Sequence, residues 1–268
     1  MSEVSESFER DGAPTRARLF VAAGLATGAP VALDARATHY LRNVLRLGVG
    51  AEVTLFNGRD GEFRARLDTV GKRAVEAVPL ACLRPQRVEP DIWLLFAPVK
   101  RARIDLIVEK ATELGVARLM PVITRHTIVG RVNLERLSAI TIEAAEQCER
   151  LSVPVVDPPV PLDAALARWP AERTLFAADE AGGGVPLGVA LSGVQPKAWG
   201  LLIGPEGGFA EAELDALRQF QFVTPVGLGP RVLRADTAVT AGPRRRAILD
   251  RRLGSSAAEL RRCKLCPS

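Results

Sequence analysis

The chain has 268 residues, of which 47% are hydrophobic and 25% charged, the proportions of an ordinary soluble globular protein with one or two domains. No apolar run reaches the roughly 18 residues of a membrane-spanning helix, so no membrane association is expected. The four cysteines do not form the framework of a secreted disulfide-rich domain, which favours a reducing, cytoplasmic location.

Positive charge gathers in two stretches of the chain, although the formal net charge is only +5. Residues 14–83 carry ten Lys or Arg and six Asp or Glu, and residues 244–268 carry eight and two. Both stretches could attract a polyanion, but an excess of this size is only weak evidence for nucleic acid. Residues 1–15 are polar and acidic and lack the apolar core of a signal peptide, which predicts a disordered leader.

Residues 16–83 have the pattern of a small β-rich domain. Asp34 can cap a helix over 35–46. Apolar and polar residues alternate over 51–70 around an NGRDG turn, which predicts a β-hairpin. With further strands expected at 18–22 and 71–83, the segment predicts a compact barrel or sandwich. The two prolines and four charges of 84–91 then predict a linker.

From residue 92 onward, strands and helices alternate. The apolar run at 92–99 is typical of a strand buried on both faces, and 104–114 has helical spacing, with Gly115 placed to end the helix. Asn133 can cap a helix over 134–151. This alternation predicts an α/β domain with a mostly parallel sheet. The remaining elements are expected at 116–123, 153–156, 162–169, 174–178, 198–204, 210–220 and 222–229.

Three of these strands end in unusual loops, at 179–184, 204–209 and 230–234. Ligands of open α/β sheets lie beyond the carboxyl ends of strands, and glycines let backbone approach a ligand closely. The glycines could equally do no more than turn the chain. Neither nucleotide-binding glycine fingerprint is present, and Glu206 would repel phosphate but attract a cation such as a sulfonium.

The segments GPEGGF, at 204–209, and LGPRVLRADTA, at 228–238, resemble the RsmE family of ribosomal RNA methyltransferases. Residues 109–127 and 143–154 resemble it as well, and 39–58 is similar to its PUA-like RNA-binding domain. The resemblance runs from about residue 16 to 241. It implies methylation of N3 of a uridine in the 16S rRNA of the small ribosomal subunit, with S-adenosylmethionine as donor.

The resemblance also implies a fold and a division of the chain. The fold is α/β: a SPOUT-type parallel sheet, knotted as a trefoil, with helices on both faces and a small PUA-like β-barrel domain before it. A homodimer without metal is expected. The expected parts are a leader at 1–15, the barrel domain at 16–83, the linker at 84–91, the methyltransferase domain at 92–241 and an atypical basic tail at 242–268.

In the family the glycine-rich loops hold the cofactor largely through backbone groups. Carried over by matching positions, the expected cofactor-binding residues are Ala178, Gly204, Pro205, Glu206, Gly207, Gly208, Leu228, Gly229, Val232 and Leu233.

The chemistry needs help at the acceptor, because N3 of uridine carries an imide proton and is a poor nucleophile until that proton leaves. Arg231 and Arg234 could stabilise the resulting oxyanion or clamp a phosphate. Asp236 is the expected catalytic carboxylate, and Glu206 is a second possible base. Each arginine could instead be a surface charge, and Asp236 could simply cap the last helix.

Basic residues of the barrel segment are candidates for phosphate contacts, and the helix over 35–46 would place Arg42 and Arg46 on one face. A merely solvated face is the alternative. His39, His126 and the lone Cys263-x-x-Cys266 pair lack companions at metal-ligand spacing, so no metal is expected. The expected RNA-binding residues are Arg16, Arg18, Arg42, Arg46, Arg64 and Arg150.

The chain departs from the family near its end. Ala235-Asp236 stands where the family usually has Thr-Glu, and Ala241-Gly242-Pro243 interrupts an expected helix, since proline costs about 3 kcal/mol in a helix interior. Two alternatives therefore stay open: a catalytically weakened relative that only binds RNA or ribosomes, and a knotted methyltransferase that acts on another RNA.

Overall fold

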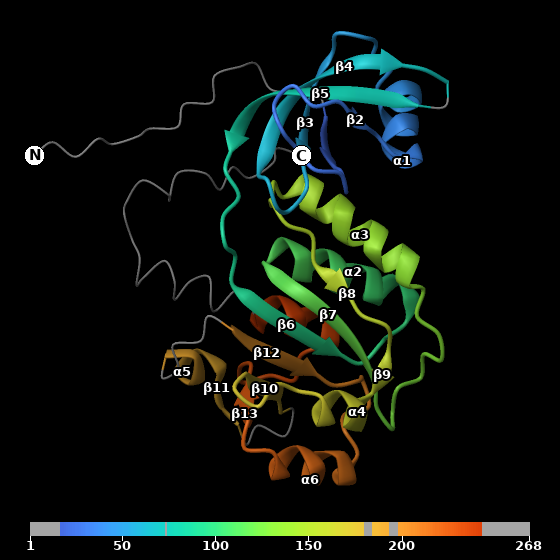
Figure 1. The fold of residues 1–268 in the computed structure, drawn as a ribbon. Helices are drawn as coiled ribbons and strands as arrows, with labels where there is room; N and C mark the ends of the chain where they lie inside the picture. Colours follow the sequence, from blue (N-terminus) through green and yellow to red (C-terminus); the bar gives the residue numbers. More distant parts are fainter. Residues whose placement is uncertain (1–16, 73, 180–183, 193–197, 243–268) are drawn as a thin grey trace, which may run out of the picture. The chain divides into compact units, whose positions relative to one another are not determined.

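The structure is a computed structural model, and it describes residues 17–72, 74–179, 184–192 and 198–242 (Figure 1). The predicted leader, most of the basic tail and the Cys263-x-x-Cys266 pair lie outside these residues. By internal contacts the chain divides into two compact units. The first holds the residues up to Val88 together with Ala145–Val153, and the second holds Glu89–Ala144 and the chain from Pro154.

The first unit is built on one curled, mixed sheet with the strand order β1-β3-β4-β5-β2. β1 runs parallel to β3, and the other pairs are antiparallel. The NGRDG hairpin is confirmed: Asn57 Oδ1 accepts the N–H groups of Arg59 and Asp60, and Gly58 and Gly61 have φ of 78° and 100°. The strands are β1 (Arg18–Phe20), β2 (Val31–Ala32), β3 (Glu52–Phe56), β4 (Glu62–Val70) and β5 (Val75–Arg84).

The predicted helix of this unit starts as expected and ends earlier. Asp34 caps α1 (Ala35–His39) by accepting the Ala37 N–H at 2.7 Å. The chain then widens into a π-helical turn, η1 (Tyr40–Val44), and Arg46 takes a left-handed φ of 54°. The chain turns there because Leu47 is buried in the core. The prediction that Arg42 and Arg46 share a helical face is therefore wrong.

The second unit contains a sheet with the order β11-β13-β10-β12-β6-β7-β8, and β9 pairs with β7. Every pairing in it is parallel, as the alternation of elements predicted. Its strands are β6 (Asp91–Phe96), β7 (Val116–Ile123), β8 (Val155–Val156), β9 (Val160–Pro161), β10 (Thr174–Ala178), β11 (Val185–Pro186), β12 (Ala198–Ile203) and β13 (Val223–Gly227).

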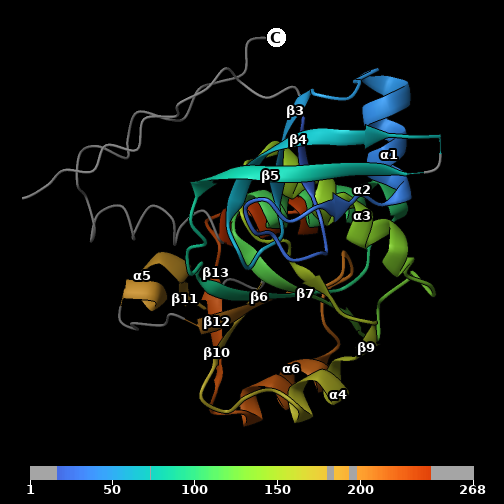
Figure 2. The ribbon, with the colours of Figure 1, turned by 45° about the horizontal axis from the view of Figure 1, so that its top comes forward.

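Helices cover both faces of this sheet because successive strand residues point to opposite sides. In β12, Leu201 and Ile203 belong to the core under α2, whereas Leu202 belongs to the core under α4 and α6. Figure 2 shows α4 and α6 on one side of the strands and α2 on the other. The helices are α2 (Arg101–Glu113), α3 (Leu134–Gln147), α4 (Leu162–Ala167), α5 (Leu187–Ser192) and α6 (Glu211–Gln219), and residues 235–242 are also helical.

Two local signals in this unit hold and one boundary does not. Gly115 follows α2 with a φ of 88°, and Asn133 Oδ1 accepts the Arg136 N–H at 3.0 Å. The helix predicted to reach residue 151 instead ends at Gln147, because Glu149 takes a left-handed φ of 59°. Within the described residues, no helix is both long and apolar enough to cross a membrane.

The last described residues, up to Gly242, are helical further than the sequence suggested. The described part of the last helix runs through Gly242, which packs so closely that an added Cβ would lie 2.3 Å from Leu201 Cδ2. Ala238 and Val239 of the same helix are buried in the core of the second unit. Gly242 thus serves close packing, and Pro243 lies outside the described residues.

Candidate functional site

The first candidate loop begins where β12 ends, at Gly204. An added Cβ there would meet the Phe209 ring at 2.8 Å, so the loop folds back on its own aromatic residue. The Gly208 N–H donates to Pro205 O at 3.0 Å and closes a tight turn. Gly208 is buried with a φ of 69°, a conformation that side-chain-bearing residues rarely adopt. The loop therefore presents mostly backbone.

The second candidate loop follows β13. Leu228 and Leu233 are half-buried and pack against the core of the second unit, whereas Arg231, Val232 and Arg234 are exposed. The two leucines anchor the loop and leave its two arginines facing solvent. Gly229 lies between β13 and the two arginines in the sequence, and its φ is 149°.

Sheet order brings the predicted cofactor residues to one edge. β10 lies between β12 and β13, and all three strands are parallel, so their carboxyl ends share an edge of the sheet. Ala178 ends β10 and pairs with Val226, and the Asp179 N–H donates to Val226 O at 3.0 Å. Gly184 also lies against this strand, since an added Cβ would come within 2.7 Å of the Val226 backbone. The arrangement offers closely packed backbone to a ligand.

The two candidate carboxylates have different surroundings. Glu206 forms an ion pair with Arg103 of α2. Asp236 lies in the first turn of the helical segment 235–242, and its Oδ1 accepts the Thr237 N–H at 2.9 Å. That turn is where the helix macrodipole stabilises a negative charge. Asp236 is half-buried, whereas Glu206 is exposed.

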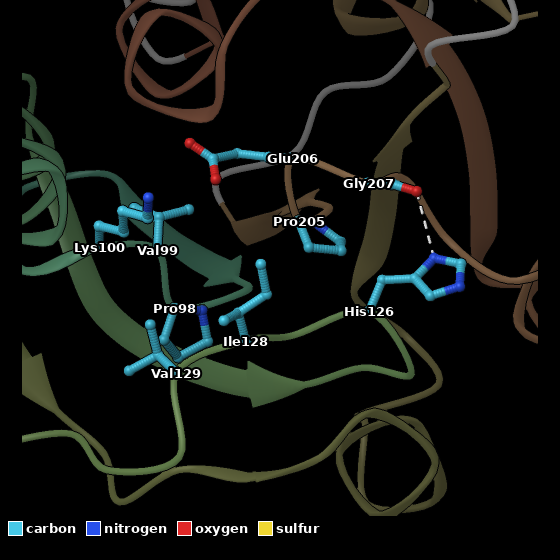
Figure 3. A pocket seen from close by; sticks show the side chains of 9 residues that line it. All are labelled: Pro98, Val99, Lys100, His126, Ile128, Val129, Pro205, Glu206 and Gly207. Carbon is cyan, nitrogen blue, oxygen red and sulfur yellow. Dashed lines mark hydrogen bonds between the residues drawn. The ribbon is translucent and has the colours of Figure 1, made fainter.

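A small pocket lies beside the first candidate loop, residues 204–209, which is called the glycine loop below. The sequence did not predict this pocket. It is lined by residues that follow β6, β7 and β12: Pro98, Val99, Lys100, His126, Ile128, Val129, Pro205, Glu206 and Gly207 (Figure 3). His126 Nδ1 lies 3.1 Å from Gly207 O and 3.1 Å from Gly208 O. The signal that could have found His126 is its place just after a strand that ends at the same edge of the sheet as β12.

The Arg18 side chain, which was expected to bind RNA, is engaged in contacts within the first unit. Its Nε contacts Glu62 Oε1 at 2.6 Å, and its terminal nitrogens donate to Ala145 O at 2.8 Å and to Arg150 O at 2.7 Å. The guanidinium also lies over the Phe56 ring, 3.8 Å from its centre. These contacts bind the carboxyl end of α3 to the sheet.

Glu62 links two arginines in this cluster, because it pairs with Arg84 as well as with Arg18. Burial would raise the pKa of Glu62, but hydrogen bonds from Arg84 and Arg18 and the charges of both arginines outweigh burial and lower it. Burial lowers the pKa of Arg18 despite its bond to Glu62. The cluster is an internal electrostatic support.

The other predicted RNA-binding residues divide in the same way. Arg150 is buried, and its Nε donates to Ser152 Oγ at 3.1 Å. Arg42 is half-buried and donates to Lys72 O at 3.3 Å, Arg46 is exposed, and Arg64 Nε lies 3.9 Å from Glu52 Oε2. These three remain candidates, and Arg16 lies outside the described residues. No group of three or more potential metal ligands occurs in the part of the chain that the structure describes.

Comparison with known proteins agrees with this architecture. Residues 87–242 match the model of an RNA methyltransferase domain, and residues 33–80 match that of an RNA methyltransferase PUA domain. Ribosomal RNA small subunit methyltransferase E from Rickettsia conorii is 31% identical over 82% of this chain and 91% of the relative. The protein of that name from Bacillus subtilis is 30% identical over 75% of this chain and 82% of its own.

A solved structure shows the same fold. The crystal structure of a ribosomal RNA small subunit methyltransferase E from Neisseria gonorrhoeae, bound to S-adenosylmethionine, superposes with a TM-score of 0.76. It is 29% identical and covers 88% of this chain and 97% of its own. The predicted fold class, a SPOUT-type parallel sheet preceded by a PUA-like domain, is thereby confirmed. The chain belongs to the ribosomal RNA small subunit methyltransferase E family.

Proposed function

We propose that this protein transfers the methyl group of S-adenosylmethionine to N3 of a uridine in the 16S rRNA of the small ribosomal subunit. The observation that carries the proposal is the pair of loops after β12 and β13, rich in glycine and close to one edge of the sheet, in a chain of this family. The Neisseria gonorrhoeae relative, alike over 88% of this chain, was crystallised with that cofactor.

The residues at the sheet edge suit such a ligand. The turn at Pro205–Gly208 and the half-buried Leu228 and Leu233 combine backbone polar groups with apolar side chains, as an adenosine and an amino-acid moiety require. When bound, the cofactor supplies a methyl group already activated by its sulfonium. The proposed cofactor-binding residues are Ala178, Gly204, Pro205, Glu206, Gly207, Gly208, Leu228, Gly229, Val232 and Leu233.

The protein's own part in the reaction concerns the acceptor. Asp236 takes the imide proton from N3, and the exposed guanidinium groups of Arg231 and Arg234 stabilise the negative charge that then spreads onto O2 and O4. As the new N3–methyl bond forms, the bond between that methyl and the sulfonium breaks. The loops serve to align the methyl with N3 and to exclude water.

The first unit is proposed to bind the RNA through Arg42, Arg46 and Arg64. The end of β5 at Arg84 and the start of β6 at Asp91 support a linker over 84–91 between a barrel domain at 16–83 and a methyltransferase domain at 92–241. We also propose that the protein acts in the cytoplasm as a homodimer, on the strength of its family.

The test is methyl transfer from labelled S-adenosylmethionine to small ribosomal subunits from a strain that lacks this gene, with the product nucleosides separated. Label in 3-methyluridine is the expected result. Cofactor binding without label would show that another RNA is the substrate. Neither binding nor label would leave a protein that only binds RNA or ribosomes.

Gly208→Val should separate cofactor binding from folding. A β-branched residue at a φ of 69° costs about 1–3 kcal/mol, so the loop will favour another conformation and the Kd for S-adenosylmethionine should rise roughly tenfold to a hundredfold. Calorimetry measures the Kd. Gly130→Val is the matched control, because Gly130 is exposed, lacks a positive φ and has no atom within 4 Å of an added Cβ. Equal affinities for the two variants would contradict a role for the turn.

A further inference from the structure

The segment Thr124–Thr127 is a tight turn that follows β7 and presents His126. The Thr127 N–H donates to Thr124 O at 3.1 Å, and the Thr124 N–H donates to Thr127 Oγ1 at 2.9 Å. The two hydroxyl groups lie 2.8 Å apart, and Thr124 is buried. With its ends tied in this way, the turn holds His126 in a defined place.

From this position the His126 ring contacts the glycine loop. Both atoms within 3.1 Å of its Nδ1 are carbonyl oxygens, of Gly207 and Gly208, and a carbonyl can only accept. Nδ1 must therefore carry the proton, in the neutral ring and in the imidazolium alike. Figure 3 shows the second ring nitrogen directed away from the other side chains of the pocket. The ring acts on the loop rather than on the pocket.

A second bridge joins the same two loops. Glu213 Oε1 accepts the Arg125 N–H at 2.8 Å, and Glu213 Oε2 accepts the Ala210 N–H at 2.8 Å. The turn after β7 thus contacts the loop after β12 directly through His126 and, through Arg125, the Glu213 side chain of α6 that holds the end of that loop. The glycine loop is braced at its end by Glu213 and at its centre by His126.

We propose that His126 is a positioning residue for the methyl donor: its Nδ1–H holds the carbonyls of Gly207 and Gly208 and so fixes the conformation of the loop at 204–209. The inference rests on the proposed function. Because a peptide unit is planar, holding the Gly207 C=O also holds the Gly208 N–H, which donates to Pro205 O and closes the turn. Glycine loses more conformational freedom on ordering than any other residue, so a loop ordered in advance binds more tightly.

Three substitutions separate a donor at Nδ1 from mere bulk. Asparagine places an amide nitrogen near the position of Nδ1, glutamine places one near Nε2, and alanine has neither. We expect His126→Ala and His126→Gln to raise the Kd for S-adenosylmethionine roughly fivefold to tenfold, and His126→Asn to stay within about twofold of the wild type. At saturating cofactor, kcat should be unchanged in all three. His39→Ala, in an exposed residue of α1, is the control for loss of a histidine.

A second readout needs no catalysis. In the cofactor-free full-length protein, amide hydrogen exchange of a peptide spanning 204–209 should be faster in His126→Ala and His126→Gln, and unchanged in His126→Asn. Equal cofactor affinity in all variants, with a wild type that binds, would overturn the inference and leave the proposed function intact. Equal weakening in all three, asparagine included, would overturn the donor role. A wild type that binds no cofactor would overturn the proposed function itself.

Discussion

Asp236→Asn is expected to lower kcat for methylation of small ribosomal subunits by about 100-fold to 10,000-fold, the usual contribution of general acid–base catalysis. The amide keeps the shape of the side chain and can still accept the Thr237 N–H through its oxygen, but it cannot take the proton from N3. The Kd for S-adenosylmethionine should change little. Single-turnover methylation at saturating cofactor measures the effect on chemistry directly.

Two further variants identify the base. Asp215→Asn is the matched control, because Asp215 is an exposed carboxylate of α6 that pairs only locally with Arg218, at 2.9 Å. Its kcat should equal that of the wild type. Glu206→Gln tests the other carboxylate, which is paired with Arg103. If Asp236→Asn retains activity and Glu206→Gln loses it, Glu206 is the base and the role given to Asp236 is wrong.

Arg18→Met is expected to destabilise the first unit by about 1.5–3 kcal/mol, the usual contribution of hydrogen bonds made by a charged group. The change leaves Arg84 as the remaining partner of Glu62 in the cluster. It also removes the side-chain donor whose hydrogen bonds Ala145 O and Arg150 O accept. Hydrogen exchange of peptides from β3, β4 and β5 in the full chain reports this unit. Arg42→Met is the control, because Arg42 makes one long bond at the surface, and a loss as large there would contradict the assignment.

The same cluster should make the first unit sensitive to acid. The folded-state pKa of Glu62 is lowered, so its stabilising contribution is complete above the ordinary carboxyl pKa, about 4.3, and is lost as the pH falls through the lowered value. Exchange in β4 should therefore accelerate below about pH 4 in the wild type. Glu62→Gln should remove this dependence, and a wild-type-like acid response in that variant would assign it to another group.

Local chemistry explains what the sequence predicted well. The Asp34 and Asn133 caps, the left-handed Gly115 and the buried strand β6 each depend on a few neighbouring residues, and each is present in the structure. The same holds for the family motifs around the glycine loops, because each motif is a continuous stretch. Helix ends were predicted less well. The chain turns at Arg46, just before the buried Leu47, and at Glu149, and the periodicity of the sequence contains neither turn.

The sequence by itself therefore determined the α/β class, the order of the elements, the glycine loops and the family. Only the tertiary structure decided which charges are available to a ligand. The sequence predicted Arg18 to be a surface cation, but the acceptors of its hydrogen bonds lie 44 and more residues away in the chain. In the sequence His126 has no companion residues, yet the carbonyl that accepts its hydrogen bond belongs to Gly207, 81 residues further along the chain. Contacts over such separations come from the pairing of strands and the docking of helices, which no short stretch of sequence encodes.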